Sequence, residues 1–169
     1  MEQWRQALVI WLESTWVPWF VNEYTWAWPI AESLHFIGLC LLVGTVGLFD
    51  LRLLGFVRSI SLPTLHRLIP WGILGFGINV LSGSMFLSAA PFQYLYNESF
   101  YFKVSFLTIA GLNILVFYTV FFRKIRTLGP GEDAPMGARV IGAVSLLMWV
   151  GVMIAGRLLT FYRPAFRFF

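Results

Sequence analysis

The sequence predicts an all-α membrane protein, a bundle of four transmembrane helices with an amphipathic interfacial helix at its N-terminus. Two observations predict this class. Of the 169 residues, 59% are hydrophobic and only 12% are charged, whereas soluble domains carry about 25% charged residues. The chain also contains four apolar segments, each with the roughly 20 residues that a helix needs to cross a bilayer. The length indicates a single bundle.

The first 28 residues form a segment rich in tryptophan, which contains six of the eight tryptophans of the chain. Trp4, Leu8 and Trp11 fall on one helical face, and tryptophan favours the headgroup level of a membrane. Glu13 and Pro18 would interrupt a spanning helix, so an interfacial helix is favoured over a fifth span. Glu13 also breaks the apolar run of a signal peptide, and none is expected.

The four predicted spans lie within residues 29–169. Their hydrophobicity is continuous rather than alternating, which excludes a β-barrel and requires helices whose backbone groups pair internally. The predicted boundaries are 29–54, 68–90, 100–122 and 139–161.

Basic residues concentrate in the two loops on one side of the predicted bundle. Cationic loops stay in the cytoplasm, so both termini are expected outside a bacterial inner membrane. The net charge of +4 fits contact with anionic lipid. No groove-reading module is present, so nucleic acid is excluded and the bilayer is the expected partner. The loop cations are Arg52, Arg58, Arg67, Arg123, Lys124, Arg126 and Arg139.

His35 is the most informative residue of the sequence, because it lies about two turns inside the outer end of the first span. An ionisable side chain at membrane depth is a functional candidate. Its alternative role is a hydrogen bond to a neighbouring helix. His66 belongs to the cytoplasmic entry of the second span, roughly 20 Å away along the membrane normal. We therefore expect His66 to be a surface residue that shares no site with His35.

Four further side chains are predicted at the depth of His35: Met85, Met153, Lys103 and Arg157. Histidine with methionine is an axial pair of haem b, and imidazole with thioether also suits copper. The two cations could bind haem propionates, a quinone oxygen or a lipid phosphate. The alternatives are packing for the methionines and snorkelling to headgroups for the cations.

Small and polar residues share one face of the second span. Gly75 and Gly83 on this face leave a groove, which fits a neighbouring helix or a flat cofactor. Asn79 on the same span, and Asn113 on the third, are predicted to form hydrogen bonds between helices.

Several chemistries are absent from the sequence. The single cysteine, Cys40, excludes an intrachain disulfide and a two-thiol redox cycle. The sequence has no zinc-type histidine pair, phosphate-binding glycine loop or Ser-His-Asp set, and no catalytic residue is identified. Asp50 and Arg52 are expected to face water or to pair with neighbouring charges.

Short motifs occur near the ends of the predicted helices: His35-x-x-Gly38, Asp50-Leu51-Arg52-x-Leu54-Gly55, Pro70-Trp71-x-x-x-Gly75-Phe76 and Asn97-x-x-Phe100-x-x-Lys103. In these motifs the chain resembles an uncharacterised bacterial family of small four-helix membrane proteins. The resemblance covers most of residues 29–157, and it implies the fold but no activity.

A fainter resemblance extends to two better understood groups. CopD-like copper-resistance membrane proteins have an intramembrane histidine in a context similar to that of His35. The haem-containing membrane protoporphyrinogen oxidase is similar at His35, Arg52-Leu53 and Lys103. That oxidase has a further histidine where this chain has Asn113, and the difference speaks against bis-histidine haem and against oxidase activity.

Three functional hypotheses remain open. The favoured one is a small redox protein that binds haem b around His35, with Met85 or Met153 as sixth ligand or with an open site. The second is copper handling by His35, Met85 and Met153. The third is an accessory subunit without a cofactor, which docks its tryptophan-rich segment on a larger membrane complex; a homo-oligomer is a further expected assembly.

Overall fold

The computed structural model describes residues 2–162, and the regular structure in this part of the chain is entirely helical. The elements are α1 (Glu2–Glu13), α2 (Trp16–Glu23), α3 (Ala27–Leu53), α4 (Leu62–His66), α5 (Ile69–Ala89), α6 (Pro91–Leu95), α7 (Glu98–Val116), the π-helical turn η1 (Phe117–Phe121), α8 (Phe122–Ile125) and α9 (Met136–Phe161).

Four helical segments of the described chain are long and apolar enough to cross a membrane: Ala27–Leu53, Leu62–Ala89, Glu98–Ile125 and Met136–Phe161. They confirm the four predicted spans. Large apolar side chains point outward from the bundle, and Leu81 and Leu147 are 70% and 65% exposed. An apolar exterior of this kind suits lipid as the surrounding medium, so the chain is a membrane protein.

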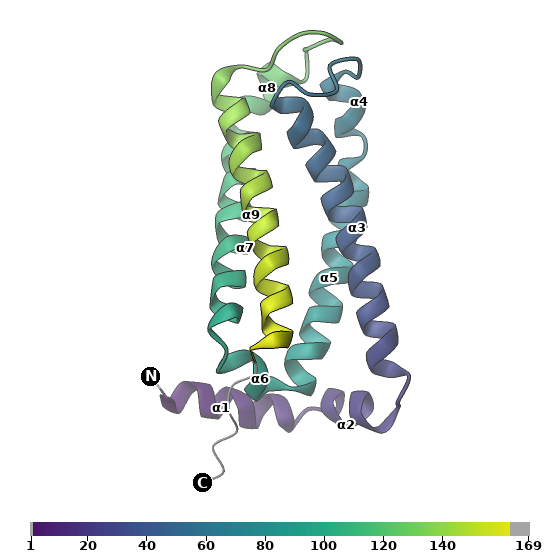
Figure 1. Cartoon of the computed structure of the whole chain (residues 1–169), viewed down its shortest axis with the longest axis vertical. Helices are drawn as coiled ribbons and strands as arrows, with labels where there is room; N and C mark the ends of the chain where they lie inside the picture. The colour runs from purple at the N-terminus through teal and green to yellow at the C-terminus, as the bar shows by residue number, and fades with distance from the viewer. Residues whose placement is uncertain (1, 163–169) are drawn as a thin grey trace.

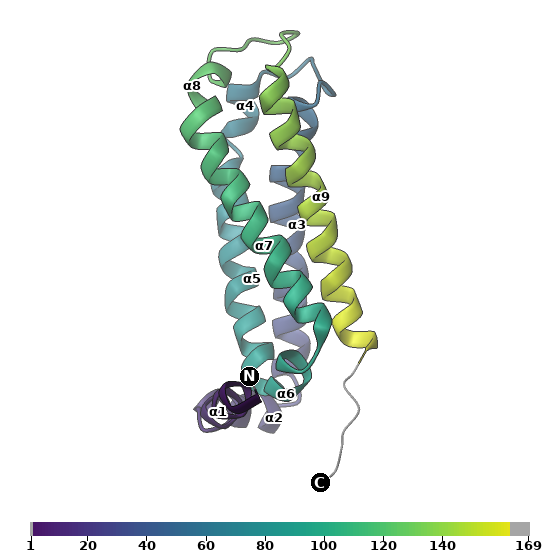
Figure 2. The same cartoon turned by 90° about the vertical axis from the view of Figure 1, so that its left-hand side faces the viewer.

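The bundle consists of two closely packed pairs of helices. α3 packs on α5, α7 packs on α9, and a contact between α3 and α9 joins the pairs (Figures 1 and 2). Glycine allows the first pair to approach: a Cβ atom at Gly75 would lie 2.5 Å from the Gly38 carbonyl oxygen. α5 and α7 are not among the closely packed pairs. The interior therefore widens on the side between these two helices.

The tryptophan-rich segment forms two helices rather than one. α1 and α2 lie across one end of the bundle, next to α6 (Figure 1). Arg5 of α1 approaches the rings of Tyr96 and Tyr101, at 5.7 Å and 5.2 Å from the ring centroids. These cation–π contacts attach the segment to the bundle. We call the end of the bundle that carries α1, α2 and α6 the His35 end. The opposite end, with α4 and α8, is called the Asp50 end.

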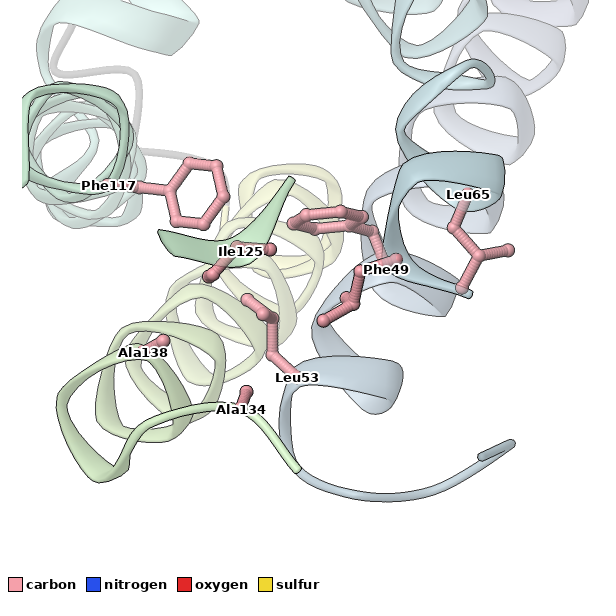
Figure 3. Packing of buried hydrophobic residues seen from close by; sticks show 8 residues of the cluster. Phe49, Leu53, Leu65, Phe117, Ile125, Ala134 and Ala138 are labelled. Atoms are coloured by element: carbon pink, nitrogen blue, oxygen red, sulfur yellow. The ribbon is translucent and has the colours of Figure 1, made fainter. Parts of the chain in front are cut away.

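The Asp50 end contains an apolar core cluster that closes the bundle (Figure 3). Arg52 beside this cluster is fully buried, so the expectation that it faces water or pairs with a charge is wrong. Its Nε donates to the Ile60 carbonyl at 2.7 Å, and Nη2 donates to the Glu132 carbonyl at 2.9 Å. The two loops at this end fold over the guanidinium and bond its Nε and Nη2 atoms with backbone oxygens, while Nη1 has no hydrogen-bond partner among the described residues. The cluster comprises Phe49, Leu53, Leu62, Leu65, Phe117, Ile125, Ala134 and Ala138.

The two asparagines predicted to link helices behave differently. Asn113 Nδ2 donates to the Ile141 carbonyl at 3.0 Å and joins α7 to α9, as predicted. Asn79 Nδ2 donates to the Gly75 carbonyl of its own helix at 2.9 Å, so the prediction is wrong for this residue. The contact between Gly38 and Gly75 brings α3 close to α5 at this level. The side-chain amide of Asn79 therefore bonds within α5 instead of to α3.

Candidate functional site

A cavity of about 460 Å³ lies among the four long helices toward the His35 end. Its volume falls within the range of about 300–1,000 Å³ that is typical of ligand pockets. Most of its wall is apolar. The polar side chains that line this His35 cavity include Glu32, His35, Tyr94, Lys103 and Arg157.

The structure brings together five of the seven residues that the sequence suggested for a cofactor. His35, Gly83, Lys103, Met153 and Arg157 all line the His35 cavity.

Gly75 and Met85 do not line this cavity. Gly75 instead lies in the close contact between α5 and α3. Met85 follows Gly83 by two residues, which rotates its side chain by about 200° around α5 and away from the cavity.

Hydrogen bonds fix the proton position on the His35 ring. The Nδ1 atom of His35 lies 2.8 Å from Ser82 Oγ, and Ser82 Oγ donates its one hydrogen to the Ile78 carbonyl at 2.7 Å. With that hydroxyl hydrogen on the Ile78 carbonyl, we assign the Ser82 oxygen as the acceptor from His35, so Nδ1 carries the hydrogen and Nε2 carries a free lone pair. None of the described residues hydrogen-bonds to Nε2. A histidine that donates from one ring nitrogen and leaves the other free has the arrangement of a metal ligand.

The lining residues are graded by depth. His35 and Met153 each lie eight residues from the helix termini at this end, Ala27 and Phe161, which corresponds to ~12 Å along the helix axis. Lys103 and Arg157 lie five and four residues from their termini, at ~7 Å. The cations thus lie between the imidazole and the surface, an arrangement that suits a flat apolar ligand with an anionic edge.

The mouth of the cavity contains Tyr94 from α6. Burial, together with the smaller effect of the negative charge of Glu32, raises the pKa of Tyr94 to about 12. The phenol therefore stays protonated and can donate a hydrogen bond at neutral pH. Arg157 beside it packs its guanidinium on the Phe161 ring, 4.8 Å from the centroid.

A second cavity of about 260 Å³ continues from the first toward the Asp50 end. Leu42, Phe76, Leu107 and Trp149 line both cavities. Trp149 and Met153 thus both face the bundle interior.

Asp50, which gives this Asp50 cavity its name, is only 4% exposed, so the expectation that it faces water or pairs with a charge is wrong. Gly142 explains the burial. A Cβ atom there would lie 3.1 Å from the Asp50 carbonyl oxygen, so α9 covers this part of α3 closely. Ser145 of α9 hydrogen-bonds to the Asp50 carboxyl group. The sequence contained a usable signal, because Ser145 and Trp149 are four residues apart on the inward face of α9.

The remaining candidates lie away from the His35 cavity. His66 lies at the Asp50 end, where its Nε2 is 3.1 Å from the Tyr118 hydroxyl. The two histidines are therefore at opposite ends, as predicted. Cys40 is exposed and lines neither cavity. Among residues 2–162, no group of three or more His, Cys, Asp and Glu side chains could hold a metal ion.

Fold and cavity together define a four-helix membrane protein with an internal cavity. Within this class, residues 8–162 match the model of a family of unknown function, DUF6644, and the chain belongs to that family. No curated protein and no solved structure matches the chain. Membership confirms the predicted likeness to an uncharacterised family, and the fainter resemblance to copper-resistance proteins and to the haem-containing oxidase gains no support.

Proposed function

We propose that the protein binds one b-type haem in the His35 cavity and serves in electron transfer. The observation that carries this proposal is the free Nε2 lone pair of His35, which is oriented by Ser82 through Nδ1. The combination of a donated Nδ1 hydrogen and an unoccupied Nε2 inside a cavity is typical of axial histidines. Bound haem would supply reversible one-electron chemistry.

The other lining residues fit the shape and charge of haem. Gly83 leaves room beside the imidazole, because a Cβ atom there would lie 3.8 Å from His35 Cε1. Met153 lies at the depth of His35 and is the candidate sixth ligand, with an open position as the alternative. Lys103 and Arg157 would bind the propionates near the surface. Trp149 closes the deep side of the cavity.

The proposed orientation places the His35 end outside a bacterial inner membrane. The cationic residues of the Asp50 end support it: Arg58 and Arg139 flank Asp133 at 3.2 Å and 3.1 Å in the loops of that end. Loops with an excess of cations stay in the cytoplasm. The haem would then exchange electrons with a partner on the outer side, or with a quinone that reaches the cavity from the bilayer.

Copper handling is the second candidate, and it has less support. His35 and Met153 line the cavity, but Met85 and Cys40 do not. Two ligands from the described residues leave a copper site incomplete, whereas one histidine suffices for a b-type haem. An accessory subunit without a cofactor is the third candidate, and the exposed tryptophans of α1 and α2 support it.

Absorption spectroscopy tests the proposal. Protein purified from haem-replete cells should show a Soret band and about one haem per chain by the pyridine haemochrome assay. His35→Ala should lose the band, and His66→Ala, the matched control at the other end, should keep it. Wild-type protein without haem, or His35→Ala that retains it, would contradict the proposal. Bound copper would favour the second candidate, and a stable larger complex free of cofactors the third.

A further inference from the structure

The Asp50 cavity contains two buried polar atoms that have no hydrogen-bond partner among the described residues. These are Oδ2 of Asp50 and Nε1 of Trp149. The two side chains are only 4% and 5% exposed, and both line the cavity. Buried polar atoms are nearly always satisfied, because an unpaired one costs free energy, especially within a membrane. Their shared location in one cavity points to a ligand.

The two atoms lie on the same part of the wall. Ser145 hydrogen-bonds to Asp50 and precedes Trp149 by four residues on α9, one helical turn or ~6 Å. The carboxyl oxygen can accept a hydrogen bond, whereas the indole N–H can only donate one. A ligand that satisfies both atoms must therefore present one donor and one acceptor.

The rest of the Asp50 cavity favours a flat apolar ring. Aromatic side chains from four helical elements line it, among them Phe49, Phe76 and Phe117. Aromatic rings pack well against other planar rings in offset or edge-to-face arrangements. The polar atoms therefore select a ring that has oxygen substituents.

The cavity also opens toward lipid. It is lined by Ile73 of α5 and Ile114 of α7, which are 66% and 41% exposed, and these two helices are not closely packed. Gly111 of α7 also lines it, and a Cβ atom there would meet nothing within 4 Å. A ligand dissolved in the bilayer can reach the interior between α5 and α7, and its hydrocarbon tail can remain in the lipid.

We propose that the Asp50 cavity is a binding site for a membrane quinone or quinol. A ring hydroxyl donates to Asp50 Oδ2, a second ring oxygen accepts from Trp149 Nε1–H, and the tail leaves between α5 and α7. A bare cation would satisfy the carboxyl group but not the indole N–H, and an acyl chain would satisfy neither. This site is separate from the proposed haem site, although Trp149 lines both cavities.

Equilibrium binding of a short-tailed quinol, decylubiquinol, tests the proposal. Calorimetry with the purified full-length protein in detergent should find about one site per chain. Loss of one hydrogen bond of about 1.4 kcal/mol corresponds to a tenfold weaker Kd. Trp149→Phe and Asp50→Leu should therefore each weaken binding about tenfold. Their matched controls, Trp11→Phe and Glu23→Leu at exposed positions, should bind like wild type.

A further variant tests the route without touching the polar atoms. Gly111→Leu places a side chain in open space at the lipid-facing edge of the Asp50 cavity, so it should weaken binding without disturbing the fold. Gly77→Leu, which also meets open space but lines neither cavity, should have no effect.

Absence of binding to wild type would overturn the proposal, as would binding that Trp149→Phe, Asp50→Leu and Gly111→Leu all leave unchanged. Binding that is lost in His35→Ala instead would place the quinol in the other cavity and would also overturn it. A preparation that binds decylubiquinol but contains no haem would support the Asp50 site while contradicting the haem proposal.

Discussion

The two cavities share four wall residues but differ in where their polar atoms lie. In the His35 cavity, Lys103, Arg157 and Glu32 lie toward the membrane surface, around an imidazole about one turn deeper. In the Asp50 cavity, two unpaired polar atoms lie in a wall that is mostly apolar. The first arrangement suits a ligand with charged substituents that remain near the surface. The second suits a neutral ligand that arrives through lipid.

The difference between the cavities follows from how the bundle is closed at each end. At the His35 end, long cationic side chains can extend to the interface, and the cavity keeps a polar mouth. At the Asp50 end, the loops cover Arg52 completely and the apolar core cluster lies between the cavity and these loops. Each of the following experiments removes or sharpens one part of this contrast.

Removal of the Arg52 guanidinium should have the largest effect, because it supports the closed end. Arg52→Leu leaves the Ile60 and Glu132 carbonyl groups without their donor. Charge-assisted hydrogen bonds contribute about 1.5–3 kcal/mol each, so we expect a loss of about 3 kcal/mol or more in the free energy of unfolding. Urea or SDS titration followed by circular dichroism measures it. Exposed Arg67→Leu is the control, and equal stability of the two variants would contradict the structural role of Arg52.

Separation of α3 from α5 should have the next largest effect. A Cβ atom at Gly75 would lie 2.5 Å from the Gly38 carbonyl oxygen and 2.8 Å from the Leu42 amide nitrogen. Backbone cannot move aside as a side chain can, so Gly75→Ala should cost about 1–3 kcal/mol. The same unfolding assay checks this value. Gly77→Ala on the same helix meets open space and should lose no stability; a matching loss in both variants would show that the close contact is not the cause.

The Ser82 hydroxyl should affect the haem site without changing the fold. Ser82→Ala removes the acceptor that orients Nδ1 of His35. Loss of such an orienting partner typically weakens metal binding about 10–100-fold. Haem affinity, measured by titration of the apoprotein at the Soret maximum, should fall by that factor. Ser84→Ala is the control, since Ser84 lines the same cavity but bonds only to a carbonyl of its own helix. Unchanged affinity in Ser82→Ala would contradict the proposed tautomer.

Tyr94 should produce the smallest effect, and only at alkaline pH. Its pKa is raised from 10.0 to about 12 in the folded protein, so the folded state holds this proton more tightly than the unfolded state. The contribution of this proton to the free energy of unfolding is fully present below pH ~10 and is lost as the pH rises toward ~12. Tyr94→Phe should therefore flatten the fall of the thermal midpoint in that interval. A fall as steep as in wild type would mean that other groups cause it.

The sequence was sufficient for the spans, for the separation of the two histidines and for five of the residues that line the His35 cavity. Continuous apolar runs and one intramembrane histidine can be recognised from short stretches of sequence. Residues at equal depth in the membrane can also line one cavity when four helices pack side by side. Met85 shows the limit of this reasoning, because depth alone does not reveal which way a side chain points around its helix.

The burial of Asp50 and Arg52 could not be predicted in the same way. It depends on two loops that fold over Arg52, one of them 80 residues away in the sequence, and on Gly142, which allows α9 to approach the Asp50 carbonyl oxygen. The unpaired atoms of the Asp50 cavity likewise become visible only when α3 and α9 are placed together.

Chemical rescue of the His35 ligand tests the central claim most directly. His35→Gly removes the imidazole and leaves a space next to Gly83 that free imidazole can occupy. The purified variant should lack the Soret band after haem addition, and millimolar imidazole should restore it with a ligand-field spectrum like that of wild type. A folded His35→Gly variant that binds haem equally well without imidazole would contradict the claim that Nε2 of His35 is the axial ligand.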